Sequence, residues 1–453
     1  METALAISPL DGKYYSKLKN LGEYFSDFAL TRFRLKIEIE YLFALGDEKC
    51  FSYLPSFAVS VKKKLRQKVD NFSLQEWEKI KEIEETTKHD VKAVEYYLRE
   101  ALVEIGLKKY QEFVHFALTS EDVNNLSYAL MWQQGIRKVY LPELIRFIKS
   151  LKFLAKATSK VAMLSLTHGQ SATPTTLGKE MAVYVERLNR ETVLLGEHKL
   201  LGKFGGATGT WAAHQLSSPQ VDWLKFSRKF VQSFDSLVFN PLTTQIEPHD
   251  SLSESLQIVV RINNILIDLS RDMWGYISRG IFLQKRKAHE VGSSAMPHKI
   301  NPIWFENAEG NLGLGTAILD HLVMKLPISR FQRDLSDSTV LRNLGVGLGH
   351  GLLAVKNLEE GFSRLDVNKE EIEKELAQHP EVLAEAIQVY LRVKGFKAPY
   401  EEIKKLTRGN KVSYDDWKKF FNSLDLPTKD KMVLLKLKLD KYIGLADNLT
   451  RLI

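Results

Sequence analysis

Apolar residues recur at helical spacing through the middle of the chain. Between residues 144 and 155 they fall three or four positions apart, just after Pro142, whose ring suits the first turn of a helix. The stretch 256–273 is apolar on nearly every face, which is typical of a helix at the centre of a bundle. These two stretches predict long helices that bury most of their surface.

A third long helix is expected over residues 306–325, although glycine disfavours a helix interior. Gly310, Gly313 and Gly315 lie within it. A glycine is tolerated in a helix where another backbone or a ligand must come close. We therefore expect tight helix packing at these positions.

The remaining pattern favours an all-α fold with three regions. No apolar and polar residues alternate regularly over strand length, and no repeat period is present. The proposed regions are an N-terminal helical domain over 1–110, a central bundle of long helices over 111–362, and a charged C-terminal helical domain over 363–453. Sites in helix bundles are built from side chains on facing helices, so the central region is where a site is expected.

Composition indicates a folded globular protein in a reducing setting. Hydrophobic residues make up 44% of the 453 residues and charged residues 26%. The single Cys50 permits no internal disulfide, and the opening METALAISPL lacks a basic and apolar leader. No run of about 18 uncharged apolar residues predicts a membrane helix. A cytoplasmic protein that spans no membrane is the expectation.

The net charge of +8 fits an anionic small substrate better than nucleic acid. The excess lysines are scattered, and no aromatic residues are interleaved with them as in a nucleic-acid binding surface. No nucleic-acid partner is therefore expected.

His168 is a candidate proton carrier. It lies in the small and polar stretch THGQSATPTT, which we expect to form a loop before a helix that starts near Thr175 or Thr176. An imidazole gives and takes protons near neutral pH. A hydrogen-bonded structural histidine is the alternative interpretation.

Two further polar stretches can be explained by helix capping alone. In FALTSEDVNNL, Thr119 and Ser120 precede acidic residues of a first turn. In ETTKHDVKAVEYYL, His89 and Asp90 precede a clear helix, and Asp90 is the expected N-cap.

The stretch GSSAMPHKINP, residues 292–302, is more specific than a turn requires. Ser293 and Ser294 follow a glycine, and Lys299 and Asn301 supply a cation and an amide. Adjacent hydroxyls offer a proton acceptor, and the cation and the amide can bind a carboxylate. A loop that closes over an anion is the hypothesis, and a surface turn before a helix near Pro302 is the alternative.

This stretch closely resembles the signature of the fumarase/aspartase superfamily, whose members release fumarate by cleaving a C–N or C–O bond. Within it, the chain resembles the adenylosuccinate lyase family almost end to end, through SPLDGKYY, TTKHDVKAVEYYL, FALTSEDVNNL, THGQSATPTTLGKEM, TTQIEPHD and SRFQRDLSDSTVLRNLGVG. The resemblance implies a three-domain all-helical subunit and a homotetramer in which each active site is shared by three subunits. It implies no cofactor.

The resemblance also implies roles for individual residues. Ser293 would be the general base that takes a proton from the carbon next to a carboxylate, and His168 the general acid that protonates the departing nitrogen. Lys299 and Asn301 are candidates to stabilise the charge that develops on the carboxylate. The remaining substrate-binding residues implied are Lys13, Tyr14, Lys88, His89, Asp90, Thr119, Ser120, Gln245, Ser294, Asn307, Arg333, Ser338 and Arg342.

Three of these, Arg333, Ser338 and Arg342, match the family's phosphate-binding positions, and Lys13 with Tyr14 match another part of that site. Arginine suits phosphate because its planar guanidinium donates two hydrogen bonds at once. A solvated helix face, or ion pairs with Asp334 and Asp337, would also explain the two arginines.

Several positions depart from the family's common residues. Lys13 replaces an arginine, Lys88 an asparagine, Leu166 an arginine, Ser171 a proline and Gly205 an asparagine. These changes affect expected contacts and leave both proton-transfer groups in place. His115, His214, His249, His298 and His350 are expected to be structural, because no metal-ligand spacing accompanies them. Two alternatives to the implied activity are another fumarate-releasing lyase, of the argininosuccinate type, and a non-catalytic helical scaffold.

Overall fold

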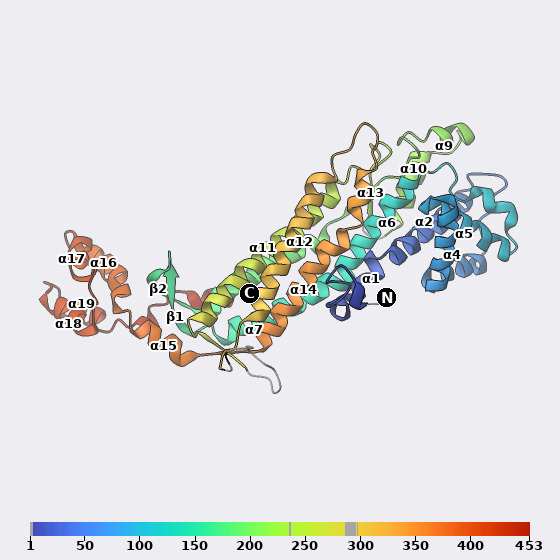
Figure 1. Ribbon diagram of the computed structural model, residues 1–453. Coiled ribbons are helices and arrows are strands. Elements are labelled where there is room, and N and C mark those ends of the chain that lie inside the picture. The colour runs from blue at the N-terminus through green and yellow to red at the C-terminus, as the bar shows by residue number, and fades with distance from the viewer. Residues whose placement is uncertain (1–2, 235–236, 286–295, 297) are drawn as a thin grey trace. The chain divides into compact units, whose positions relative to one another are not determined.

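Helices dominate the computed structural model, which describes residues 3–234, 237–285, 296 and 298–453 (Figure 1). The all-α class predicted from the sequence is confirmed. Within these residues, no helix combines the length and the apolar character needed to cross a bilayer.

Contacts between residues divide the chain into two compact units, each made from separate stretches of sequence. The first consists of Met1–Leu144, Glu191–Asn264 and Gly310–Val355, and the second of Ile145–Arg190, Ile265–Glu309 and Lys356–Ile453. The division into regions 1–110, 111–362 and 363–453 follows chain order instead, and it stays a prediction.

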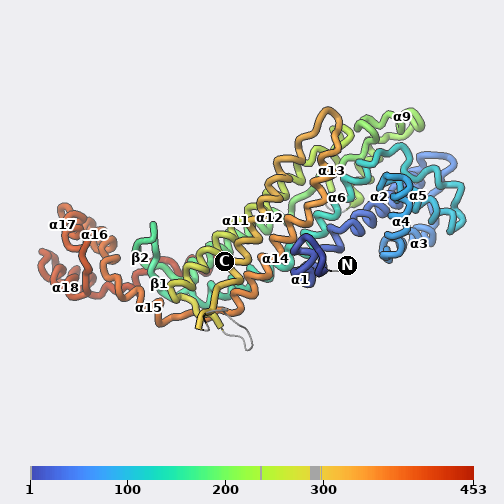
Figure 2. The backbone as a smooth tube through the Cα atoms, in the orientation of Figure 1, coloured from blue at the N-terminus to red at the C-terminus, as the bar shows by residue number. Residues whose placement is uncertain are grey.

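The first unit contains helices of 6 to 21 residues. They are α1 (Tyr15–Phe25), α2 (Asp27–Asp47), α3 (Val59–Asp70), α4 (Leu74–Thr87), α5 (Asp90–Glu104), α6 (Ser120–Gly135), α9 (Ala212–Ser217), α10 (Trp223–Gln232) and α13 (Ser336–Leu341), with short 3₁₀ helices at Thr3–Leu5 and Lys108–Phe113. The backbone trace shows α4 and α5 side by side (Figure 2). Helix α2 packs against α6, and this pair supports the candidate site described below.

The predicted long helices are present. Helix α7 (Leu141–Ala157) follows α6 without a break through a π-helical turn at Ile136–Tyr140, and Pro142 lies in its first turn as expected. The other long helices are α8 (Leu177–Glu197), α11 (Asp250–Ser278), α12 (Ile303–Lys325) and α14 (Leu344–Ser363). In α11, Val259, Ile262, Leu266, Leu269 and Met273 are fully buried, as its apolar sequence predicts.

Close packing explains only one of the three glycines in α12. A Cβ atom at Gly315 would lie 2.9 Å from the carbonyl oxygen of Gly347 and 3.1 Å from the Cβ of His350, so a larger residue would push α14 away. At Gly310 and Gly313 a Cβ would meet no other part of the described chain within 4 Å. The expectation of tight packing is therefore confirmed for Gly315 and wrong for the other two within this chain.

The strands form three two-stranded sheets among the described residues. Strands β1 (Ala162–Thr167) and β2 (Gln170–Thr176) are antiparallel, β3 (Leu200–Gly202) and β4 (Leu237–Phe239) are parallel, and β5 (Phe282–Gln284) and β6 (Leu365–Val367) are antiparallel. The first pair corrects the loop expected around His168, because this segment is a hairpin. His168 and Gly169 form its turn with φ of 53° and 71°, as a two-residue hairpin turn requires.

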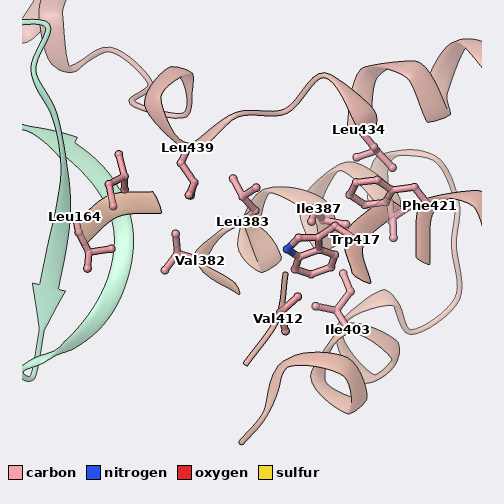
Figure 3. Packing of buried hydrophobic residues seen from close by; sticks show 12 residues of the cluster. Leu164, Val382, Leu383, Ile387, Ile403, Val412, Trp417, Phe421, Leu434 and Leu439 are labelled. Atoms are coloured by element: carbon pink, nitrogen blue, oxygen red, sulfur yellow. The ribbon is translucent and has the colours of Figure 1, made fainter. Parts of the chain in front are cut away.

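Short helices around an apolar core complete the second unit. They are α15 (Lys369–Ala377), α16 (Ala384–Val393), α17 (Pro399–Thr407), α18 (Tyr414–Ser423), α19 (Thr428–Leu435) and α20 (Ala446–Thr450), with 3₁₀ helices at Pro380–Leu383 and Leu439–Lys441. Trp417 lies in this core beside Phe421, with ring centroids 5.9 Å apart (Figure 3). Its indole N–H donates to the carbonyl of Pro380 at 2.9 Å, so the core buries no unpaired indole group.

A histidine and a glutamate form a buried pair that makes stability depend on pH. His115 Nδ1 lies 2.5 Å from a carboxylate oxygen of the fully buried Glu38. Burial alone would lower the pKa of His115, but the Glu38 carboxylate outweighs it and raises that pKa. A raised pKa in the folded state stabilises the fold below the histidine's ordinary pKa of about 6.5, and this contribution is lost as pH rises through the raised value.

We therefore expect the wild type to exceed His115→Gln in melting temperature by more at pH 6 than at pH 9. Thermal unfolding of both proteins across this range measures the difference. A difference that stays constant, or that grows toward pH 9, would contradict the pairing.

Candidate active site

The N-terminus of α6 is capped by its own first turn, as the sequence predicted. Thr119 is the N-cap, and the Asp122 carboxylate accepts a hydrogen bond from its backbone N–H at 2.8 Å. This capping fixes the backbone of Thr119 and Ser120 at the start of the helix. Both side chains are partly exposed there and remain accessible to a substrate.

Asp122 also binds a second segment of the chain from the interior. The Nζ of Lys203 lies 2.7 Å from its carboxylate, and both side chains are fully buried. The backbone N–H groups of Gly205 and Gly206 donate to the same carboxylate at 2.8 and 3.1 Å. One buried carboxylate therefore joins the start of α6 to the segment 203–206.

Gly205, where the family commonly has asparagine, is closely packed in this chain. A Cβ there would lie 3.1 Å from the Trp211 ring and 3.2 Å from the Cα of Gly209. Position 205, where this chain has glycine, is therefore tightly packed beside Asp122.

At the start of α5 the structure corrects the expected cap. The N-cap is His89, whose Nδ1 accepts a hydrogen bond from the N–H of Lys92 at 3.2 Å, whereas Asp90 is the first helical residue. The other ring nitrogen of His89 lies 3.5 Å from Ser120 Oγ, so the starts of α5 and α6 meet. The sequence suggested that the Asp90 carboxylate caps the helix. In the structure this carboxylate binds Arg34 and Arg342 instead.

Two arginines share the Asp90 carboxylate. Arg34 lies 2.7 Å from it and also donates to the Asn124 side chain at 2.8 Å, and Arg342 lies 3.6 Å from the same carboxylate oxygen. Burial works to raise the pKa of Asp90, but Arg34, the N–H of Val91 and Arg342 lower it on balance. Asp90 is therefore ionised at neutral pH and holds Arg342 in place by its charge.

The proposed phosphate-binding residues lie beside this group. Arg342 donates to the hydroxyl and to the carbonyl of Ser338, one helical turn earlier, at 3.2 Å each. Arg333 donates to the Gln245 side chain at 3.3 Å and lies 3.1 Å from the Glu121 carboxylate. Five predicted residues, His89, Asp90, Ser120, Ser338 and Arg342, are thus linked by direct contacts, and Gln245 and Arg333 join them through Glu121, the residue after Ser120.

Lys88 and the residues ahead of α1 contribute further donors in the same unit. Lys88 ends α4 with a left-handed backbone, φ 54°, and its side chain is exposed. Lys13 is exposed just before α1, with Nζ 5.5 Å from the centre of the Tyr14 ring.

His168 belongs to the second unit and is exposed at the tip of the β1–β2 hairpin. The hairpin is bound to the C-terminal part of the chain close to its tip, because Ser171 Oγ lies 3.1 Å from His379 Nδ1, which in turn lies 2.7 Å from Glu381. Ser171 stands where the family commonly has proline. The departure therefore adds a polar contact that steadies the hairpin carrying His168.

The signature stretch is described only in part. Ser293 and Ser294 lie outside the described residues. Lys299 is exposed, and Asn301 lies just before α12, where the carbonyl of the adjacent Ile300 accepts a hydrogen bond from Gln284 at 2.8 Å. Asn307, in the first turns of α12, accepts a hydrogen bond from Asn357. The helix expected over residues 306–325 is present as α12, which starts at Ile303, directly after Pro302.

Sequence reasoning missed Arg34, Glu121 and the pair of Asp122 with Lys203. Arg34 offered no local signal, because Arg32, Lys36 and Glu38 lie around it in α2 and the sequence does not separate its buried charge from theirs. Glu121 and Asp122 were counted as first-turn acids, and nothing in the sequence shows that they are buried.

Two models of known protein families match consecutive parts of the chain. A family model described as Lyase matches residues 12–315, and one described as Adenylosuccinate lyase C-terminal matches residues 329–443.

Full-length relatives agree with these models. The chain is 49% identical over 451 residues to the adenylosuccinate lyase of Legionella pneumophila strain Corby, covering 99% of both chains. It is 48% identical to that of Haemophilus influenzae and 47% identical to that of Escherichia coli K12, covering 98% of each chain in both cases.

Solved structures show the same fold at low sequence identity. A fumarate lyase from Mesorhizobium sp. BNC1 superposes with a TM-score of 0.76 at 16% identity, over 95% of this chain and 96% of that one. The 3-carboxy-cis,cis-muconate lactonizing enzyme of Pseudomonas putida gives 0.74 at 18% identity, over 96% and 95%.

Proposed function

The chain belongs to the adenylosuccinate lyase family, and on that premise we propose that it eliminates fumarate from adenylosuccinate and leaves AMP. The observation that supports this substrate is the group of His89, Ser120, Ser338 and Arg342 around the starts of α5 and α6, with Asp90 binding Arg342. This group places cationic and hydroxyl donors together, as a phosphate-bearing anion requires. The same residues suit the succinyl-aminoimidazole-carboxamide ribotide of purine synthesis, which we propose as a second substrate.

The proposed reaction breaks one C–H bond and one C–N bond of the succinyl group. A base removes the proton from the carbon next to a carboxylate, and the electron pair forms the C=C bond of fumarate as the nitrogen departs. An acid on the opposite side protonates that nitrogen, which remains as the amino group of AMP. We assign Ser293 as the base and His168 as the acid.

Charge that develops on the carboxylate needs fixed donors. Lys299 and Asn301 are assigned to this role, because a cation and an amide near the developing charge stabilise the transition state more than the ground state. Thr119, Ser120, Gln245 and Ser294 are assigned to the succinyl carboxylates and the neighbouring polar atoms, and Asn307 to the same substrate.

The nucleotide end is assigned to the first unit. Arg333, Ser338 and Arg342, with Lys13 and Tyr14, would bind the phosphate, and Lys88, His89 and Asp90 would contact the rest of the nucleotide. The exposed guanidinium of Arg342, oriented by Asp90, supports its assignment.

We further propose a cytoplasmic homotetramer in which different subunits supply parts of each active site. The family resemblance supports this arrangement. It explains why the acid and the base need not converge within one chain.

Two candidate substrates distinguish this proposal from the related lyase activity. Purified protein should convert adenylosuccinate and leave argininosuccinate untouched, because only the nucleotide carries a phosphate for the arginines of the first unit. Fumarate release from each compound, measured by chromatography, is the test. Release of fumarate from argininosuccinate but not from adenylosuccinate would overturn the assignment of substrate.

A further inference from the structure

Glu121 is a buried carboxylate in the first turn of α6 that the proposed reaction does not use. Its side chain is 2% exposed, and its Oε2 lies 3.1 Å from the guanidinium of Arg333. Its Oε1 is buried and has no hydrogen-bond partner among the described residues. Because removing a carboxylate from water is unfavourable, a charge in this position needs a compensating interaction.

Arg333 is the main compensating group, and it is fixed by two contacts. Besides Glu121, it donates to the Gln245 side chain at 3.3 Å, and Gln245 in turn donates to the carbonyl of Ala207 at 3.1 Å. The Arg333 side chain is 17% exposed, so part of it still reaches solvent. Two contacts determine the plane of a guanidinium, which one contact would leave free to rotate.

Other titratable groups face Glu121 from the neighbouring segments. His249 and Asp337 are both buried, with His249 Nε2 3.9 Å from Asp337, and the buried Lys203 lies beyond Asp122. Burial raises the pKa of Glu121, while Arg333, His249 and Lys203 oppose that rise and Asp337 adds to it. The groups around Glu121 thus carry charges of both signs. The Glu121 carboxylate therefore depends on Arg333 to compensate its buried negative charge.

We propose that Glu121 is a positioning residue, which orients the Arg333 guanidinium to receive the phosphate of the substrate. The inference rests on the proposed function, since it takes Arg333 as a phosphate ligand. A phosphate gains two parallel hydrogen bonds only if the guanidinium plane faces it. Without the Glu121 oxygen, Arg333 keeps its charge and its contact with Gln245 but loses the fixed orientation.

The two reaction products separate this role from a general structural one, because AMP carries the phosphate and fumarate does not. In Glu121→Ala we expect the inhibition constant of AMP to rise about tenfold or more, as loss of an oriented hydrogen bond to a charged group predicts. The inhibition constant of fumarate should stay near the wild-type value. The KM for adenylosuccinate should rise while kcat changes little.

Glu121→Gln provides the conservative comparison. Its amide oxygen can still accept a hydrogen bond from Arg333, so we expect it to recover most of the affinity for AMP. Glu370→Ala, which removes an exposed first-turn acid of α15, is the control and should behave as wild type.

The inference is wrong if Glu121→Ala raises the inhibition constants of AMP and fumarate by the same factor, or if it leaves the inhibition constant of AMP unchanged. It is also wrong if Glu121→Gln is as impaired as Glu121→Ala. A wild type that neither converts adenylosuccinate nor responds to AMP would instead contradict the proposed function. Melting temperatures of all variants show whether a loss reflects unfolding.

Discussion

His168→Asn is expected to lose about 10²- to 10⁴-fold in kcat while keeping its fold. Without the imidazole, the departing nitrogen must take its proton from water, and the C–N bond breaks more slowly. Initial rates with saturating adenylosuccinate measure the effect. Turnover near the wild-type value would contradict the assignment of His168 as the acid.

Asparagine is the informative replacement because of the backbone at this position. His168 has φ 53°, and asparagine tolerates this left-handed region better than most residues, so the hairpin turn is retained. Alanine would strain the turn and confuse the loss of a proton donor with a change in the hairpin.

The proposed sharing of sites between subunits can be tested with the same variant. Mixing inactive His168→Asn with inactive Ser293→Ala under conditions of subunit exchange should restore part of the activity, because some sites then receive both intact groups. Differential labelling shows whether the subunits have exchanged. If they have exchanged and no activity returns, the shared site is contradicted.

Asp122→Asn is expected to lower the free energy of unfolding by about 3–5 kcal/mol. The substitution leaves the ammonium group of Lys203 fully buried without its charged partner, and it weakens the N–H contacts of Gly205 and Gly206. Denaturant unfolding followed by circular dichroism measures the change. An unfolding midpoint equal to that of the wild type would show that this pair does not stabilise the fold.

Two further proteins separate the buried pair from a general charge effect. Asp122→Asn combined with Lys203→Met removes both charges and keeps a side-chain oxygen for the backbone N–H groups of Thr119, Gly205 and Gly206, so it should recover much of the lost stability. Asp415→Asn removes one partner of an exposed ion pair with Lys418 and should change stability very little.

The long helices could be predicted because burial imposes a regular spacing on their apolar residues. The continuous apolar character of 256–273 identified α11, and the pattern after Pro142 identified α7. Gly310 and Gly313 show the limit of such reasoning. A glycine indicates that a close approach is possible, and among the described residues a Cβ added at either of these two positions would meet no neighbouring atom within 4 Å.

The hairpin around His168 was missed because its strands lack a regular alternation. The register shifts between Leu164 and Ser165, and Pro174 pairs with Leu164 in the second strand. A two-stranded pair tolerates a proline because each strand has a free edge. Small and polar residues at such an edge resemble a loop in the sequence.

The candidate site was found through its motifs, but its internal connections were not. The resemblance named His89, Asp90, Ser120 and Arg342, and the structure links them directly. Arg34 binds Asp90 from 56 residues away in the sequence. Such a long-range contact has no local signature, so charge partners like this one become visible only in the folded chain.

The most direct test of the account is to quantify AMP and fumarate formed from adenylosuccinate by the purified wild-type protein. The ultraviolet absorbance change gives the rate, and chromatography gives both products, with the His168→Asn protein prepared in parallel as the control. The account predicts rapid conversion to equal amounts of AMP and fumarate by the wild type alone. No conversion by a folded wild-type protein, or conversion at the same rate by the control, would contradict it.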